Sequence, residues 1–239
     1  MARKKASFPG FPKETLQFFR GLEKNNNREW FEKKKPLYEE KVKAPMMELI
    51  QALSEEMVDY APDYITEPKK AIFRIYRDVR FSKNKDPYKT NIAASFKRQN
   101  LGKNDSAGLY VHLDTKGIMV AAGSYMPMPD HLKLMRKHIE ANPEEMRKLI
   151  SNKTLIKLMG ELHGEQLTRT PKGFLPGHPA DDLILRKMYI FWTQLDVELA
   201  ETPQALEEIS KRLKAVTPFV EFLNRPVIVS KRSNALLRF

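Results

Sequence analysis

The chain has 239 residues, of which 41% are hydrophobic and 30% are charged, a balance that allows a real core and argues against disorder throughout. Its formal net charge of +12 favours anionic partners such as nucleic acid or phosphorylated metabolites. Cysteine is absent, which excludes disulfides, thiolate metal ligands and cysteine nucleophiles. The basic N-terminus lacks an apolar signal region, and no run of about 18 apolar residues occurs, so we expect a soluble, cytoplasmic protein without a membrane partner.

The N-terminal third reads as helical. After a basic arm at residues 1–7, the aromatic and proline-rich residues 8–12 are suited to pin the chain to the body of the protein. Residues 13–24 have the apolar spacing of a helix, and Asn27 can cap the next one. That second helical region carries Pro36 and Pro45, which we expect to divide it into two or three pieces.

Residues 71–90, AIFRIYRDVRFSKNKDPYKT, are the most unusual stretch of the sequence. Residues 72–82 alternate in the manner of a strand, so one face would carry Arg77 among apolar side chains. A guanidinium on a core-facing row is costly unless it is paired. Either Arg77 has a carboxylate partner, or the strand bulges there and redirects it towards neighbouring Asp78.

A lysine-rich turn follows this predicted strand, and the two together are a candidate anion site. Guanidinium, ammonium and hydroxyl groups that converge beside a strand suit a phosphate or carboxylate ligand. The alternative is a solvated hairpin turn whose charges form only structural ion pairs. The candidate ligand-binding residues here are Arg74, Arg77, Arg80, Ser82, Lys85, Tyr88, Lys89 and Thr90.

The remaining pattern predicts more strands and then helices. Residues 91–97 read as a strand, residues 108–114 and 118–124 as a hairpin, and residues 188–194 as a further strand. Helices are expected at 130–140, 143–158 and 203–223, with an irregular segment at 160–180 whose length is typical of functional loops. We predict one α+β domain at residues 8–224, with an antiparallel sheet of about four to six strands flanked by N-terminal and C-terminal helices. Residues 225–239 are expected to be a basic appendage, or a last strand at 227–229 followed by a tail.

Several segments together resemble a known bacterial family, domain of unknown function 2461. They are FPGFPKETLQFFRGLEKNNNREWFEKKKPLYEE, AIFRIYRDVRFSKNKDPYKTNIAASF, AGLYVHL, YMP, LTRTPKGF, HPADDLILRK and PFVEFLN, in that order, between about residues 8 and 224. The resemblance implies a single α+β domain. It implies no catalytic role, because no activity is established for the family.

Standard catalytic motifs are absent from the sequence. Asp78 could orient an arginine or act as a base, and His178 and Asp181 are further weak catalytic candidates, although Asp181 and Asp182 more often cap a helix. Lys172, in the 160–180 segment, could deliver an ammonium group to an anion. His131 and His138 lie seven residues apart on one predicted helix, but no third ligand is near, so neither a metal nor a cofactor is predicted.

Three functions remain open at this stage. The preferred hypothesis is a pocket that binds a small phosphate- or carboxylate-bearing ligand, and it makes no claim about catalysis. The second is nucleic-acid binding through the basic surface, with Tyr76, Tyr88 and Phe96 as nearby aromatic groups. The third is a structural or interaction module without a ligand, and the oligomeric state stays undetermined.

Overall fold

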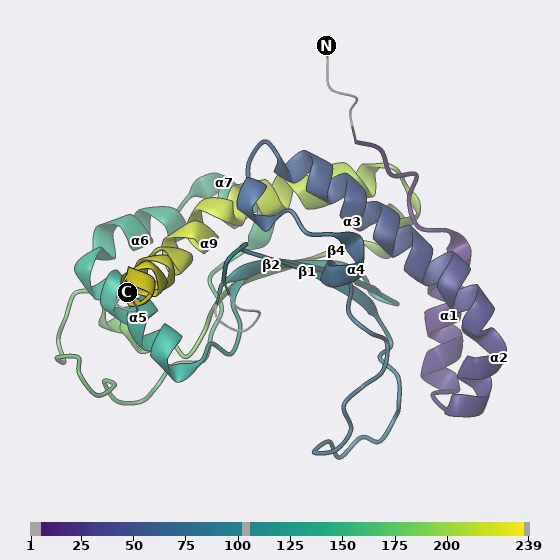
Figure 1. Cartoon of the computed structure of the whole chain (residues 1–239), viewed down its shortest axis with the longest axis horizontal. Helices are drawn as coiled ribbons and strands as arrows, with labels where there is room; N and C mark the ends of the chain where they lie inside the picture. Colours follow the sequence, from purple (N-terminus) through teal and green to yellow (C-terminus); the bar gives the residue numbers. More distant parts are fainter. Residues whose placement is uncertain (1–5, 102–105, 237–239) are drawn as a thin grey trace, which may run out of the picture. The chain divides into compact units, whose positions relative to one another are not determined.

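The computed structural model describes residues 6–101 and 106–236 and is of the α+β class (Figure 1). Its four-stranded antiparallel sheet has the order β1-β2-β3-β4, formed by Ile92–Lys97, Gly108–Asp114, Gly117–Ser124 and Tyr189–Leu195. The predicted single α+β domain and the number of strands are therefore confirmed. Residues 1–5, 102–105 and 237–239 lie outside the described part, and with them most of the predicted basic arm.

The chain forms two compact units. The first consists of residues 1–96, 110–120 and 194–211, and the second of residues 97–109, 121–193 and 212–239. The first unit contains the basic stretch at 71–90, and the second contains Lys172, His178 and Asp181.

The first unit begins with helices built on aromatic packing. They are α1 (Lys13–Lys24), α2 (Arg28–Tyr38), a π-helical turn (Glu39–Lys43) and α3 (Ala44–Met57), followed by a 3-10 turn (Pro62–Tyr64) and the short α4 (Pro68–Ala71). Asn27 caps α2 by accepting a hydrogen bond of 2.9 Å from the backbone N–H of Trp30, as predicted. The region divides into three pieces, within the two or three predicted, and α3 begins beside Pro45. The first division lies just after Pro36, in the π-helical turn, because α2 continues through that proline to Tyr38.

The two faces of the sheet differ in the first unit. Apolar side chains on one face are buried, and they include Ile92, Ala94, Phe96, Val111, Leu113, Ile118 and Val120. Figure 1 shows α3 lying over one face of the sheet. The alternate positions carry half-buried, mostly polar groups: Ser95 on β1, and Tyr110, His112 and Asp114 on β2. This second face of the sheet therefore carries half-buried polar groups at several positions.

The second unit is mostly helical. It contains α5 (Pro129–Ala141), α6 (Pro143–Ile150), α7 (Lys153–Met159), the four-residue α8 (Asp181–Ile184) and the larger part of α9 (Gln204–Leu236); a 3-10 turn at Val197–Glu201 belongs to the first unit. As predicted, residues 160–180 are irregular apart from isolated bridges, such as the one between His163 and Ile190.

The predicted C-terminal appendage is not a separate tail where the structure describes it. Helix α9 passes Pro218 and Pro226 and continues to Leu236, so the alternative of a strand at 227–229 is wrong. Val227 is 1% exposed, and Arg225 forms two hydrogen bonds of 2.9 Å with the carboxylate of Glu145. Residues 225–227 therefore pack as part of the second unit.

Candidate functional site

The basic stretch of residues 71–90 is a long loop rather than a strand. It folds back on itself through two isolated antiparallel bridges, Ile72 with Ala94 and Tyr76 with Tyr88. Between them, the N–H of Arg77 donates to the carbonyl of Pro87 (2.9 Å) and that of Lys89 to the carbonyl of Ile75 (2.8 Å). The alternation of residues 72–82 predicted a regular strand, which is wrong because the returning leg pairs with it at only a few positions. We call this segment the basic loop; Figure 1 shows it leaving α4 and returning to β1.

The base of the basic loop is fixed to α2 and the turn before it. Asn26 bonds the backbone of Tyr88 twice, accepting from its N–H at 3.1 Å and donating to its carbonyl at 3.0 Å. The Tyr88 ring stacks on Phe31 with 4.1 Å between the centroids, and the residue is 2% exposed. Tyr88 was predicted to bind ligand, but this packing makes it a structural anchor. Tyr88 and the fully buried Phe96 were also predicted as aromatic partners for nucleic acid, and their burial rules out that contact.

Most cations of the basic loop contact the loop itself. Arg80 forms a two-pronged ion pair with Asp78, at 3.0 and 2.7 Å. This pair holds the pKa of the Asp78 carboxyl down at about 2, chiefly through the hydrogen bonds from Arg80. Lys85 donates to the carbonyl of Val79 at 3.1 Å, and Lys89 donates to the carbonyl of Arg74 at 3.0 Å. These carbonyls orient the two ammonium groups.

Arg77 is the one candidate guanidinium that is largely covered, with 27% of its side chain exposed. It does not meet Asp78. Its contacts are long: 3.3 Å to the carbonyl of Asp86, 3.5 Å to the hydroxyl of Ser82 and 4.0 Å to the Asp86 carboxylate. The sequence left two possibilities for Arg77, a carboxylate partner or a bulge towards Asp78. The structure shows a carboxylate partner, Asp86, but at the long distance of 4.0 Å.

The tip of the basic loop presents an aromatic ring to solvent. Phe81 is 95% exposed, and the Arg80 guanidinium lies 5.7 Å from the centre of its ring. The alternation had placed Phe81 on a core-facing row, which is wrong. Tyr76, nearer the base, is 44% exposed.

The candidate ligand-binding residues of the basic loop are only partly covered. Arg74, Arg80 and Lys85 are exposed, whereas Ser82, Lys89 and Thr90 are half-buried. The loop holds six cations against two carboxylates, so a net charge of +4 stands largely in contact with water.

The candidates in the second unit mainly support their own turn. The carboxylate of Asp181 accepts from the N–H of Gly177 at 2.6 Å, and Nδ1 of His178 accepts from the N–H of Ala180 at 3.1 Å. Asp182 pairs with Arg147 at 2.8 Å, which agrees with a structural role for the two adjacent acids. Lys172 is exposed.

A polar row on β2 was missed as a site by the sequence reasoning. The phenol oxygen of Tyr110 lies 3.0 Å from Nδ1 of His112, and Nε2 of His112 lies 3.6 Å from the carboxylate of Asp114. The alternation of Tyr110, His112 and Asp114 was visible in the sequence. Nothing in the pattern showed that their face of the sheet would be half-buried, which is what gives such a row its chemical interest.

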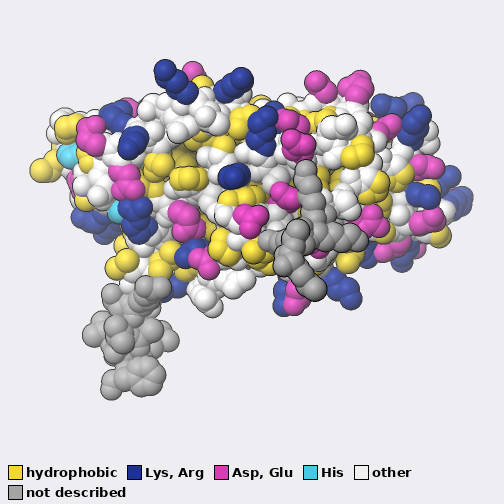
Figure 2. Space-filling model, turned by 90° about the horizontal axis from the view of Figure 1, so that it is seen from above, with side chains coloured by type: hydrophobic (Ala, Val, Ile, Leu, Met, Phe, Trp, Pro, Cys, Tyr) yellow, Lys and Arg dark blue, Asp and Glu magenta, His cyan; other side chains and the backbone are white. Residues whose placement is uncertain are grey.

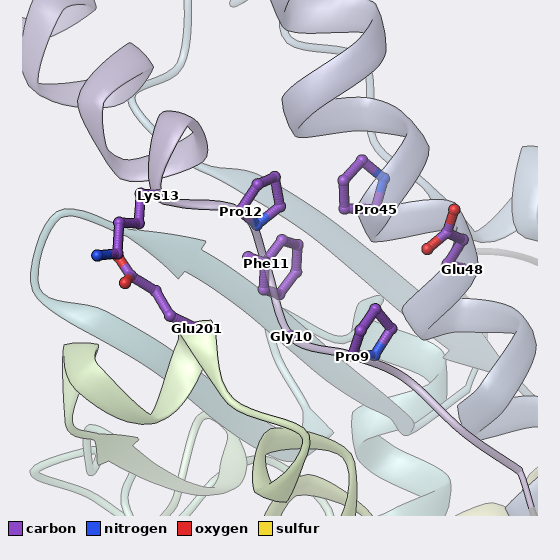
Figure 3. A pocket seen from close by; sticks show the side chains of 8 residues that line it. All are labelled: Pro9, Gly10, Phe11, Pro12, Lys13, Pro45, Glu48 and Glu201. Carbon is purple, nitrogen blue, oxygen red and sulfur yellow. The ribbon is translucent and has the colours of Figure 1, made fainter.

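A pocket of about 420 Å³ lies elsewhere in the first unit (Figure 3). It is lined by the N-terminal lead-in, the start of α3 and the 3-10 turn before α9, through Pro9, Gly10, Phe11, Pro12, Lys13, Pro45, Glu48 and Glu201. The lead-in is anchored as predicted, because Phe8 and Phe11 are each 2% exposed and the N–H of Phe11 donates to the carbonyl of Ala200 at 2.7 Å. None of the predicted site residues lines this pocket.

In the described ranges, no cluster of three or more His, Asp or Glu side chains is arranged to hold a metal ion. None of the helices within those ranges combines the length and apolar character needed to span a bilayer.

The fold and the basic loop define an α+β protein with a cation-rich surface loop beside its sheet. The chain belongs to the conserved hypothetical protein family DUF2461, whose profile matches residues 14–222. This confirms the family resemblance of the sequence. Comparison with curated proteins finds no match.

Proposed function

We propose that the protein binds single-stranded nucleic acid through the basic loop. The observation that carries this proposal is Phe81, an almost fully exposed aromatic ring at the tip of a loop with a net charge of +4. A single exposed apolar side chain is ordinary on a protein surface, but Phe81 stands among exposed cations, and that combination suits a nucleic acid. Bases stack on such rings whatever their sequence, and neighbouring cations take the phosphates.

The charges of the basic loop suit a phosphate backbone better than an enclosed ligand. Arg74, Lys83 and Lys85 are all exposed, so they can reach successive phosphates without losing buried contacts. The Arg80 guanidinium is already fixed beside the Phe81 ring by Asp78, which lowers the entropy lost on binding.

On the face shown in Figure 2, Lys and Arg are interspersed with Asp and Glu. We assign the contact to the basic loop because it holds six cations and two carboxylates, within the cytoplasmic setting that the sequence predicts.

Fluorescence anisotropy with a labelled oligothymidylate tests the proposal. We expect binding to weaken steeply between 50 and 200 mM salt, because phosphate contacts release counterions. Phe81→Ala should weaken binding by about 5- to 150-fold, which corresponds to roughly 1–3 kcal/mol for one stacked base. The double variant Lys83→Gln/Lys85→Gln removes two phosphate contacts. It should therefore reduce the slope of log K against log salt concentration by roughly 1.4.

Leu175→Ala is the matched control. Leu175 is also a highly exposed apolar side chain, at 79%, but it belongs to the second unit. Its removal should leave the affinity unchanged. Binding that ignores salt, or that Phe81→Ala and Leu175→Ala affect equally, would contradict the assignment.

A small phosphate-bearing ligand at Arg77 is a second candidate, and the long contacts of this covered guanidinium favour it. A phosphate beside Arg77 and Ser82 would replace contacts of 3.3–4.0 Å by charge-assisted hydrogen bonds of normal length. Thermal-shift assays with inorganic phosphate and pyrophosphate test it. A rise in melting temperature that is lost in Arg77→Gln and retained in Phe81→Ala would support this site, and no rise at millimolar concentrations would reject it.

A further inference from the structure

The row Tyr110, His112 and Asp114 on β2 links a phenol, an imidazole and a carboxylate in one line. The phenol oxygen and Nδ1 of His112 are 3.0 Å apart, which is hydrogen-bond distance. On the other side of the ring, Nε2 of His112 is buried and makes no hydrogen bond in the described structure, and the Asp114 carboxylate lies 3.6 Å from it. The imidazole is thus enclosed between two partners of opposite character.

The position of the carboxylate determines the protonation of the ring. With 12% of the His112 side chain and 24% of the Asp114 side chain exposed, the carboxylate acts on Nε2 with little screening by water. It favours the tautomer that carries hydrogen on Nε2, because a lone pair facing the carboxylate would be repelled. Nδ1 is then the acceptor, and the Tyr110 phenol is the donor.

Asp114 is itself held in place. The N–H of Lys116 donates to its Oδ1 at 2.8 Å across the β2–β3 turn. Its Oδ2 remains directed towards His112. This order, from a fixed carboxylate to an imidazole to a hydroxyl, is the arrangement by which a base activates a hydroxyl nucleophile.

The resting charges agree with this order. Burial raises the pKa of Tyr110 to about 12, so the phenol is neutral and needs a base at the moment of reaction. Burial also lowers the pKa of His112, against the opposing effect of Asp114, so the imidazole is neutral and can accept a proton.

We propose that these three residues form a catalytic relay, with Tyr110 as the nucleophile, His112 as its base and Asp114 as a positioning residue. The phenol oxygen attacks an electrophilic phosphorus while the phenol proton moves to Nδ1 of His112. The bond from phosphorus to the leaving alkoxide breaks, and His112 returns the proton to that alkoxide. Water then attacks the phosphotyrosine, giving one proton to His112, and the released phenolate takes it back.

The choice of a phosphate ester as substrate rests on the proposed function, because the basic loop adjoins the row. Phe73 contacts Tyr110 edge to face, with 6.1 Å between centroids, and the ammonium of Lys89 lies 5.1 Å from the centre of the Phe73 ring. The base of the loop therefore borders Tyr110, and a phosphate held there would lie close to the phenol. The relay itself depends only on β2.

Labelling with phenylmethanesulfonyl fluoride tests the relay without any nucleic acid. The probe is uncharged, and the attacking phenol displaces fluoride from its sulfur while the base takes the proton. At pH 7.5 we expect Tyr110 to be sulfonylated at least about tenfold faster than Tyr125, which is far more exposed at 71%. His112→Gln should remove this advantage, since a general base contributes about 100-fold or more. Peptide mass spectrometry gives the rate at each tyrosine.

The positioning role of Asp114 is tested with two variants. Asp114→Asn should slow the labelling of Tyr110, and Asp114→Glu should restore part of the rate, which a merely structural role would not produce. Nitrogen-15 NMR of the unmodified protein should show His112 as the Nε2–H tautomer, a measurement that needs no variant to fold.

A reversed His112 tautomer, or a Tyr110 that reacts no faster than Tyr125, would overturn the relay. Phe81→Ala distinguishes the two proposals, because it should abolish stacking in the oligothymidylate assay and leave sulfonylation of Tyr110 unchanged. Failed labelling with salt-dependent binding intact would reject the relay alone, and the reverse result would reject only nucleic-acid binding.

Discussion

A single amide, that of Asn224, satisfies both backbone groups of Ala107 just before β2. Asn224 is fully buried; its Oδ1 accepts from the N–H of Ala107 at 2.8 Å and its Nδ2 donates to the carbonyl at 3.1 Å. Asn224→Ala leaves a buried donor and a buried acceptor without this partner, so we expect a loss of about 2–3 kcal/mol in unfolding free energy. Urea denaturation measures it. Asn25→Ala, at an exposed position, should cost less than about 0.5 kcal/mol, and equal effects of the two changes would refute the argument.

The pair between Asp78 and Arg80 makes a prediction for acid titration. Because the native pKa of Asp78, about 2, lies below its unfolded value, the pair contributes stability above roughly pH 4 that is lost as the pH falls towards 2. In Arg80→Gln the pKa of Asp78 should rise towards roughly 4, as followed by carboxyl carbon-13 NMR. Lys83→Gln should leave it in place. An unchanged pKa in Arg80→Gln would show that the ion pair does not persist in solution.

For individual residues, the sequence predicted which side chains lie on the same side better than which side chains contact each other. The alternation of residues 72–82 placed Asp78 and Arg80 on the same side, and they do pair. It could not show that Arg77 would contact Asp86, because that contact depends on how the returning leg of the loop folds back. For the same reason Tyr88 was taken for a ligand group, although Phe31, far away in sequence, covers it.

Among the elements, the hairpin of β2 and β3 has a strict requirement at its turn. Gly117 has φ +126°, and a Cβ placed there would lie 2.1 Å from the carbonyl oxygen of Leu195. Gly117→Ala should therefore cost more than about 2 kcal/mol, because both the backbone conformation and the contact are unfavourable. Gly173→Ala separates the two causes: Gly173 has φ +90° but no atom within 4 Å of the added Cβ, so only the conformational cost remains. Thermal denaturation should show a clearly larger shift for Gly117→Ala.

Elements that make regular local hydrogen bonds were predicted well from the sequence. The first helix and the hairpin have strong periodic patterns, and they form close to the expected limits. The basic loop has a strand-like pattern too, but a strand needs continuous pairing with a neighbour, which residue patterns alone do not reveal. The helix through Pro218 and Pro226 shows the opposite case, in which packing of α9 outweighs two breakers.

For the molecule as a whole, the limits of the domain depend on the chain beyond Asn224. Val227 is buried at 1% exposure, and Val229, two residues on, is 59% exposed. If residues 225–227 belong to the fold, Val227→Ala should lower the unfolding free energy by about 1–3 kcal/mol, and Val229→Ala by less than about 0.5 kcal/mol. Equal, small effects in chemical denaturation would instead support the appendage that the sequence suggested.

The candidate site is the part of the molecule that the sequence predicted least completely. The excess of cations in the basic loop follows from composition, but the loop's exposure and the solvent-facing ring of Phe81 do not, since both result from the loop leaving the sheet. The Tyr110, His112 and Asp114 row depends on which face of the sheet is covered, which is a property of the assembled fold.

The two hydrogen bonds between Asn26 and the backbone of Tyr88, and the stacking of Phe31 on the Tyr88 ring, have a practical consequence for the basic loop. They anchor its returning leg, and the bridge between Tyr76 and Tyr88 ties the outgoing leg to it. A trypsin cut after Lys83 or Lys85 at the exposed tip would therefore sever the chain without releasing either half. The nicked protein would elute as one species under native conditions and separate into two peptides only in denaturant. Its halves could then be produced apart and recombined, with one of them carrying isotopes or an altered tip.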